Sequence, residues 1–275
     1  MADLLKGPVR SVASRNMMYG KRPGARWEQT FDRGGNLTGE IFYTEKDSIT
    51  SWYTFEYDAA GRRKEETDLH ADPCDRDSRW VYRYDEATGR LAELQKYDPE
   101  TGRHFITLAY TYGADGRSVR EEEVWADKYR LLLREFTLDG DGSVTVTSFS
   151  RMEGGSRLSI IFDAAGRPVK IVSYENLHAP AALRGTYEYD AAGKLLRERG
   201  SWPSVSYVRE YGYNAEGDLI SMRLHAPDGA FKHGARYDYE YDARGNWVKR
   251  TAWYFRAGQE KETPGDVITR SITYY

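Results

Sequence analysis

The most regular feature of the sequence is a short unit in which alternating aromatic and polar residues end in a turn signal. Its clearest copy is Tyr187–Leu196, which reads YEYDAAGKLL. Alternation with a period of two is typical of a half-buried β-strand, and Asp-Ala-Ala-Gly followed by an apolar run is typical of a tight turn into a second strand. The unit therefore predicts a β-hairpin.

The unit recurs through most of the chain. Its turn glycines lie 24 to 28 residues apart and span 210 residues at a mean spacing near 26; they are Gly35, Gly61, Gly89, Gly116, Gly142, Gly166, Gly193, Gly217 and Gly245. Two strands per repeat predict an all-β fold, an antiparallel meander of about nine 26-residue β-hairpin repeats. Because strand twist accumulates across a wide sheet, we expect a strongly curled structure, whether open coil, barrel-like or partial shell.

The repeat also suggests a domain division and a set of structural turn residues. Residues 1–24 are expected to form an N-terminal cap strand and loop, and residues 25–275 a single repeat domain.

In each turn, Asp is expected to accept backbone hydrogen bonds and Gly to supply a positive φ. The clearest turn-structural residues are Asp58, Gly61, Asp85, Gly89, Asp163, Gly166, Asp190, Gly193, Asp242 and Gly245. The copies at Gly116 and Gly142 are degenerate, since Gly113 replaces the aspartate in one and Leu138 the aromatic residue in the other.

The aromatic residues of the repeats share one parity, as at Tyr53, Phe55 and Tyr57. One face of the sheet is therefore predicted to be aromatic and the other polar. Such rings could stack on sugars or hold partner side chains. The candidate binding platforms are Trp52, Trp80, Tyr82, Tyr110, Tyr187 and Tyr239. The alternative is that these rings only pack neighbouring strands together.

Composition argues against some classes of partner but does not identify a partner. The 40 basic and 43 acidic residues give a net charge of −3, which provides no bulk attraction for nucleic acid. Mean hydropathy is −0.76 and no long apolar run occurs, so a membrane span is not expected, nor is a lipid-facing barrel. The single Cys74 cannot form an internal disulfide, and the first residues lack a signal-peptide pattern. These observations do not identify the cellular compartment of the protein.

No catalytic or metal motif stands out, so the sequence favours a protein that is not an enzyme and has no cofactor. The five histidines, His70, His104, His178, His225 and His233, are scattered and are expected to lie exposed in loops. The acidic runs Glu65–Glu66 and Glu121–Glu123 are expected to be solvated; a carboxylate-dependent glycoside hydrolase is the least favoured alternative.

Three copies carry a family resemblance: YDAAGR at Tyr57–Arg62, YDAAGK at Tyr189–Lys194 and YDARGN at Tyr241–Asn246. The chain resembles YD-repeat, or Rhs-repeat, proteins over residues 27–250, and it is similar to uncharacterised bacterial envelope proteins built only of such repeats. Large Rhs proteins wind these repeats into a hollow β-shell around a toxin, and wall-associated relatives are linked to carbohydrate binding. The resemblance implies a curled β-hairpin fold.

The function that these observations favour is a non-catalytic binding or scaffold role in the bacterial envelope or a secreted system. The suspected location is the periplasm, the cell surface or outside the cell, and the ligand is a glycan or a protein. The alternative is a toxin-sheltering or immunity-type partner associated with Rhs proteins. The C-terminal strand, Ser271–Tyr275, is also expected to offer an exposed edge to another chain.

Overall fold

A computed structural model describes residues 5–18, 22–72, 74–125, 129–150, 155–176, 179–202, 205–259 and 261–275. Within them the chain forms twenty β-strands, and these residues contain no helix long and apolar enough to span a membrane. The strands are β1 (Val9–Met18), β2 (Arg22–Phe31), β3 (Leu37–Tyr43), β4 (Ile49–Tyr57), β5 (Arg63–His70), β6 (Ser78–Tyr84), β7 (Leu91–Tyr97), β8 (His104–Tyr112), β9 (Ser118–Val124), β10 (Arg130–Leu138), β11 (Val144–Phe149), β12 (Arg157–Phe162), β13 (Pro168–Tyr174), β14 (Ala182–Tyr189), β15 (Leu195–Trp202), β16 (Val205–Tyr213), β17 (Leu219–His225), β18 (Phe231–Tyr241), β19 (Trp247–Arg256) and β20 (Thr263–Tyr274).

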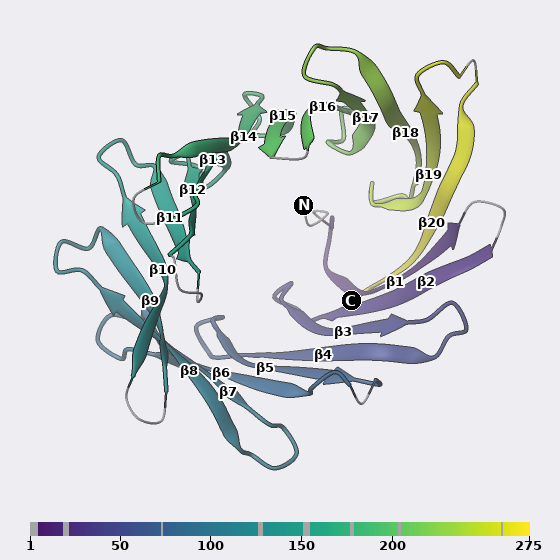
Figure 1. Cartoon of the computed structure of the whole chain (residues 1–275). Helices are drawn as coiled ribbons and strands as arrows, with labels where there is room; N and C mark the ends of the chain where they lie inside the picture. The colour runs from purple at the N-terminus through teal and green to yellow at the C-terminus, as the bar shows by residue number, and fades with distance from the viewer. Residues whose placement is uncertain are drawn as a thin grey trace.

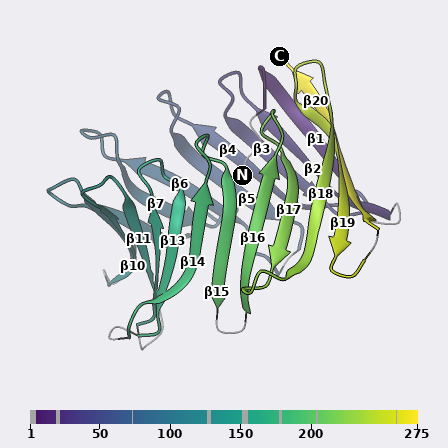
Figure 2. The same ribbon diagram turned by 90° about the horizontal axis from the view of Figure 1, so that it is seen from above.

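The strands form one closed antiparallel barrel (Figures 1 and 2). Each strand pairs with its neighbours in the sequence, and β1 pairs with both β2 and β20. The predicted all-β meander is therefore confirmed, and the barrel is the form that its curl takes. Residues 9–18 of the expected N-terminal cap are a strand of this barrel, and the proposed division at residue 24 stays a prediction.

The expectation of an exposed edge on the C-terminal strand is wrong. One edge of β20 bonds to β19 and the other to β1, where Ser271 faces Ala13 and Thr273 faces Ser11. The reason is closure, because a barrel has no edge strands. The sequence pattern could not show this pairing, which joins residues more than 250 positions apart.

The repeat turns all lie at one end of the barrel, because antiparallel neighbours reverse direction at every connection. In the turn at Gly61, one oxygen of Asp58 accepts hydrogen bonds from the backbone N–H groups of Ala60 and Arg62, each at 2.9 Å. Gly61 has a φ of 75°, which is costly for a residue with a Cβ. The same aspartate contacts recur at Asp163 and Asp242, and Asp190 bonds the N–H of Lys194. At Asp85 the extra turn residue shifts the contacts to the N–H and hydroxyl of Thr88.

The repeat tyrosine links each hairpin to the preceding one. The hydroxyl of Tyr57 donates to the carbonyl of Leu37 at 2.9 Å, two residues beyond the preceding turn glycine. The same bond is made in four further copies: Tyr84 to Arg63, Tyr112 to Leu91, Tyr189 to Pro168 and Tyr213 to Leu195. Each of these hydroxyls therefore adds a side-chain bond, near the turn end, between two strands that already pair in the sheet.

The basic residue after the turn glycine links each hairpin to the following one. The guanidinium of Arg62 lies 4.2 Å from the ring centre of Tyr84 and donates to the carbonyl of Gly89. Matching cation–π contacts pair Arg90 with Tyr112, Arg167 with Tyr189 and Lys194 with Tyr213. In the last repeat the residue that stacks on the next tyrosine, Tyr274, is Arg244, which precedes the turn glycine. At these junctions, tyrosine and the basic residue thus link successive turns of the barrel.

The two ends of the described chain together build a tenth hairpin, split at its turn. The N–H of Tyr275 donates to the carbonyl of Pro8 at 3.0 Å, as the N–H of Asp58 does to that of Arg62 in an intact turn. Val9 faces Tyr274 just as Arg63 faces Tyr57. Gly7 has a φ of 83° and lies against Arg244 of the preceding turn. Tyr274 and Gly7 therefore hold the places of the repeat tyrosine and turn glycine.

Candidate binding surface on the inner wall of the barrel

The N-terminal segment identifies which side chains face the interior. Residues 5–8 lie inside the ring of strands (Figure 1), and Leu5 and Pro8 line a cavity together with Val12, Trp27 and Arg270. Residues directly opposite each other in a sheet share a face, so the pairing register carries this face from strand to strand around the barrel. We call the side that contains Val12 and Trp27 the inner wall.

Five of the six candidate platforms lie on the inner wall. Following the register places Trp80, Tyr82, Tyr110, Tyr187 and Tyr239 there. Trp52 instead lies on the outer wall, where it faces Ile41 and Leu69. All six are half-buried. The rings on the inner wall therefore keep part of their surface accessible.

The inner wall groups its tyrosines around acidic and basic side chains, and the first cluster lies on β5 and β6. Glu66 accepts hydrogen bonds from the hydroxyl of Tyr82 at 3.1 Å and from the guanidinium of Arg63 at 2.9 Å. Burial raises the pKa of Tyr82, with the negative charge of Glu66 contributing further. The phenol therefore stays protonated and donates to the carboxylate.

The second cluster joins Tyr110 on β8, Glu121 on β9 and Arg134 on β10. Glu121 is 2% exposed and accepts from the Nε of Arg134 at 3.0 Å. Burial raises the pKa of Tyr110 strongly, followed by the charge of Glu121 and a hydrogen bond to it. Glu123, two residues on and on the same face, is 3% exposed.

These two buried glutamates correct the expectation of a solvated acidic run. Alternation places Glu121 and Glu123 on the inner wall, opposite Tyr110 and Leu108, whereas Glu122 lies on the outer wall opposite Ala109. Exposed charge is the default for a glutamate, but pairing with a guanidinium offsets the cost of burying Glu121.

The third cluster is centred on Glu198 of β15, whose side chain is 14% exposed. Glu198 accepts hydrogen bonds from the hydroxyls of Tyr207 and Tyr211 at 2.5 and 2.8 Å and from Arg209 at 3.1 Å. Burial, with a hydrogen bond to Glu198, raises the pKa of Tyr207 and of Tyr211 to about 12. Tyr187 faces Glu198 across the strand pair, and burial raises its pKa as well.

The four described histidines lie in strands and not in the expected loops, and two of them are also half-buried. His70 lies in β5, where its Nε2 is 2.8 Å from Asp68 and its ring packs edge-on against Tyr53. His225 lies in β17, and its side chain is only 20% exposed. The cause is that both strands extend further than the turn signals suggested. His104 and His233 are exposed strand residues, and His178 lies outside the described residues.

The outer wall differs in chemistry from the inner wall. It carries ion pairs between neighbouring strands, such as Glu122 with Arg130 at 2.9 Å and Glu210 with Arg197 at 2.8 Å. The predicted contrast between an aromatic and a polar face therefore corresponds to inside and outside. No group of three or more possible metal ligands occurs among the described residues.

Sequence reasoning identified the aromatic rings but missed the charged groups between them, namely Arg63, Glu66, Glu121, Arg134, Glu198 and Arg209. Parity was an available signal for the acidic residues, because Glu121 and Glu123 share one face of their strand. Their grouping with tyrosines depends on the register between strands, which a single sequence does not reveal. The inner wall thus combines partly exposed rings with phenol donors, carboxylate acceptors and guanidinium groups.

Comparison with known proteins finds likenesses of fold only. No protein-family model matches the chain, and the search of curated proteins finds no match. Among solved structures, it is similar to a Photorhabdus luminescens Tc holotoxin pore containing TccC3 (14% identity, TM-score 0.40), covering 86% of this chain and 14% of that one.

It is also similar to porin-like proteins from Bacteroides uniformis (11% identity, TM-score 0.43) and Bacteroides vulgatus (11% identity, TM-score 0.32). These cover 98% and 97% of this chain and 99% and 98% of the other. Both groups have low identities and TM-scores, at which a shared function does not follow.

Proposed function

We propose that the protein is a non-catalytic binding protein that holds a glycan against the inner wall of its barrel. The observation that carries this proposal is the set of half-buried rings interleaved with the Glu66, Glu121 and Glu198 clusters. Aromatic faces stack on the apolar faces of sugar rings, while the neighbouring polar groups bond hydroxyls. The outer wall, with its ion pairs, faces water, and the protein acts in the bacterial envelope or a secreted system.

The clusters suit recognition better than proton transfer. The raised pKa values of Tyr82, Tyr110, Tyr207 and Tyr211 keep their phenols protonated near neutral pH. The carboxylates that they contact are already paired with guanidinium groups. Fixed donors and acceptors of this kind orient a ligand without exchanging protons with it.

A binding comparison between the two walls tests this proposal. The protein is applied to a broad glycan array, and the hits are titrated by calorimetry and tryptophan fluorescence. Trp80→Ala removes an inner-wall ring, and we expect it to weaken binding about tenfold, equivalent to about 1.4 kcal/mol. Trp52→Ala is the matched control, since it removes a tryptophan from the outer wall. If no glycan on the array binds, or if both variants lose the same affinity, glycan binding at the inner wall would be refuted.

A polypeptide ligand is a second candidate, favoured by one contact inside the barrel. Asn246, which is 4% exposed, binds the backbone of Lys6 on both sides: its Oδ1 accepts from the N–H at 2.6 Å and its Nδ2 donates to the carbonyl at 2.8 Å. The side-chain amide of this turn residue thus binds the backbone of another segment through an N–H and a carbonyl group, the groups that pair in a β-sheet. A role in sheltering a partner polypeptide belongs to this alternative.

Co-purification of the protein from its native host tests the second candidate. A polypeptide ligand predicts a stoichiometric partner that protects inner-wall residues from carbodiimide labelling, detected by mass spectrometry. Isolation of the protein alone, with Glu198 labelled equally before and after purification, would exclude a bound polypeptide.

A further inference from the structure

A fourth group of side chains on the inner wall has the components of the three clusters except the carboxylate. In each of those clusters a guanidinium and at least one phenol meet a glutamate. On β18 and β19 the corresponding side chains are Arg250, Tyr237 and Tyr254, which the register places on the same wall as Tyr239. The inner-wall residues that pair across β18, β19 and β20 include no acidic side chain.

Aromatic rings hold the Arg250 guanidinium, in place of an ion pair. Its central carbon lies 5.3 Å from the ring centre of Tyr237 and 5.9 Å from that of Trp247. No hydrogen bond or ion pair of this guanidinium is found in the described part of the chain, whereas the guanidiniums of the other three clusters each pair with a glutamate. A guanidinium that stacks on rings keeps its N–H groups for a planar anion such as a carboxylate.

The two phenols of this group also lack an acceptor. Among the described residues, no hydrogen bond is found for the hydroxyl of Tyr237 or of Tyr254. Tyr254 is 41% exposed, and Tyr237 and Arg250 are half-buried. Each of the three side chains can therefore donate a hydrogen bond to a ligand in the interior of the barrel.

Small residues fix the two rings against the wall. Tyr237 faces Ala252 and Tyr254 faces Ala235 across the strand pair, and these alanines are only 3% and 1% exposed. The ring of Tyr254 also lies over Gly265, where a side chain would clash with it. The positions of the phenols are thus set before any ligand arrives.

Asp266, the one acidic residue of β20, does not take the place of the missing glutamate. Burial raises the pKa of Tyr254, the negative charge of Asp266 raises it further, and the positive charge of Arg250 lowers it. Both charges therefore lie near this phenol. No ion pair between Asp266 and Arg250 is found among the described residues, so the guanidinium stays without a carboxylate.

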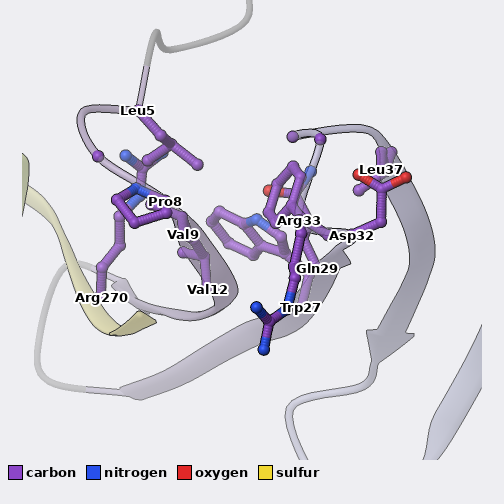
Figure 3. A pocket seen from close by; sticks show the side chains of 14 residues that line it. Leu5, Pro8, Val9, Val12, Trp27, Gln29, Asp32, Arg33, Leu37 and Arg270 are labelled. Carbon is purple, nitrogen blue, oxygen red and sulfur yellow. The ribbon is translucent and has the colours of Figure 1, made fainter. Parts of the chain in front are cut away.

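A second guanidinium stacks on Trp247 but is not part of this group. Arg270 lies 3.3 Å from the ring centre of Trp247, and it lines the cavity shown in Figure 3 together with Val12 and Trp27. Arg270 has a further partner within the protein, so no ligand is assigned to it. Trp247 is 6% exposed and serves as a packed support for Arg250.

We propose that the glycan of the inner wall contains a uronic acid, whose carboxylate binds Arg250 between the hydroxyls of Tyr237 and Tyr254. This inference rests on the proposed glycan-binding function and names its class of ligand. The sugar carboxylate accepts from the guanidinium and the phenols, as the glutamates do in the other three clusters. A sugar is favoured over an acidic peptide because its ring can also stack on the exposed face of Tyr254.

The test titrates oligosaccharides of galacturonate, glucuronate and mannuronate, each compared with its uncharged methyl ester, by calorimetry and tryptophan fluorescence. We expect at least one acid to bind about tenfold more tightly than its ester, because the ester loses the charge-assisted hydrogen bonds. Equal affinity for acid and ester, or no binding of any acid, would overturn the proposal.

Two further probes separate this proposal from its alternatives. Neutral glycans that bind in a Trp80-dependent way, with no preference for an acid, would overturn the uronate assignment and leave the proposed function standing. Poly-L-glutamate tests an acidic polypeptide. If it binds and no uronate does, the group belongs to a polypeptide ligand and the proposal fails.

Substitutions locate the carboxylate. Arg250→Gln should lower the affinity for the acid about tenfold, to that of its ester, without changing the affinity for the ester. Tyr237→Phe combined with Tyr254→Phe keeps both rings and should cost the acid about fivefold in affinity.

Lys249→Gln is the matched control. It removes one positive charge from the next residue of β19, which lies on the outer wall and pairs with Glu240 at 2.6 Å, so binding should be unchanged. Circular dichroism checks that each variant is folded. If the acid binds folded Arg250→Gln as tightly as the unchanged protein, the assignment to Arg250 is overturned.

Discussion

At the scale of single residues, the repeat tyrosine does more than its ring suggests. Sequence reasoning explained it by packing on an aromatic face. The structure adds a hydroxyl that bonds a carbonyl of the preceding hairpin, and Tyr57 with Leu37 is the first such pair. Leu138 and Phe162 lack this hydroxyl, so the hairpins around β10 to β13 have fewer links at the turn end.

Removing one of these hydroxyls measures its contribution to the stability of the folded protein. We expect Tyr57→Phe to lower the free energy of unfolding by about 1 kcal/mol, the usual net worth of a hydrogen bond. Urea unfolding followed by circular dichroism measures the change. Tyr53→Phe is the matched control on the same strand, since no hydrogen bond of its hydroxyl is found among the described residues. Equal effects in the two variants would contradict a linking role for the Tyr57 hydroxyl.

The tyrosines around Glu198 predict a response to alkaline pH. Their pKa of about 12 lies above the usual value of about 10, so the stability they contribute is complete below pH 10 and is lost as the pH rises towards 12. Phenolate absorbance at 295 nm should therefore show a late-ionising group of tyrosines.

Glu198→Gln removes the negative charge and should move the ionisation of Tyr207 and Tyr211 to lower pH. The control is Glu188→Gln, which removes an acidic residue from the outer wall. If neither variant alters the late-ionising group, the assignment of these pKa shifts to Glu198 would fail.

At the scale of the hairpin, the turn aspartates make the barrel sensitive to acid. Hydrogen bonds from the backbone N–H of Arg62 and then from its side chain lower the pKa of Asp58, and Arg167 has the same effect on Asp163. A depressed folded-state pKa stabilises the protein above the unfolded pKa, near 3.9, and this contribution is lost as the pH falls through the folded value.

We therefore expect the urea midpoint of the barrel to fall as the pH drops below about 4. Asp58→Asn and Asp163→Asn together keep an acceptor oxygen in each turn but remove its titration, so the doubly substituted barrel should lose less stability between pH 4 and 2 than the unchanged protein. Parallel pH profiles for the two proteins would show that these turns do not carry the acid response.

The hairpins were predictable because their signals are local. The Asp and Gly of each turn lie within five residues of one another, and the parity of Tyr53, Phe55 and Tyr57 correctly indicated one aromatic face. The charged clusters of the inner wall were not predictable, because Glu198 meets Tyr211 only through the register of β15 and β16. The turn signals also gave no hint of a tenth hairpin, whose tyrosine and glycine lie at opposite ends of the chain.

At the scale of the whole molecule, that split hairpin is the feature on which barrel closure depends. β1 supplies the second edge for β20, and Gly7 and Tyr274 reproduce the turn that other copies make within one segment. The ends are thus held by non-covalent contacts alone, and they lie beside the cavity that Pro8 and Phe31 line.

A circular permutant tests this description of closure. The turns at Asp58, Asp163, Asp190 and Asp242 have two residues between the aspartate and the glycine, so joining Tyr275 to Lys6 through a single alanine should rebuild a turn of this kind. New ends are opened between Asp228 and Gly229, in the return from β17 to β18. We expect a folded barrel at least as stable as the original, because the linkage reduces the entropy lost on bringing the ends together. A ten-residue glycine–serine linker is the matched control and should stabilise less. If only the long-linker protein folds, the ends do not form a repeat turn.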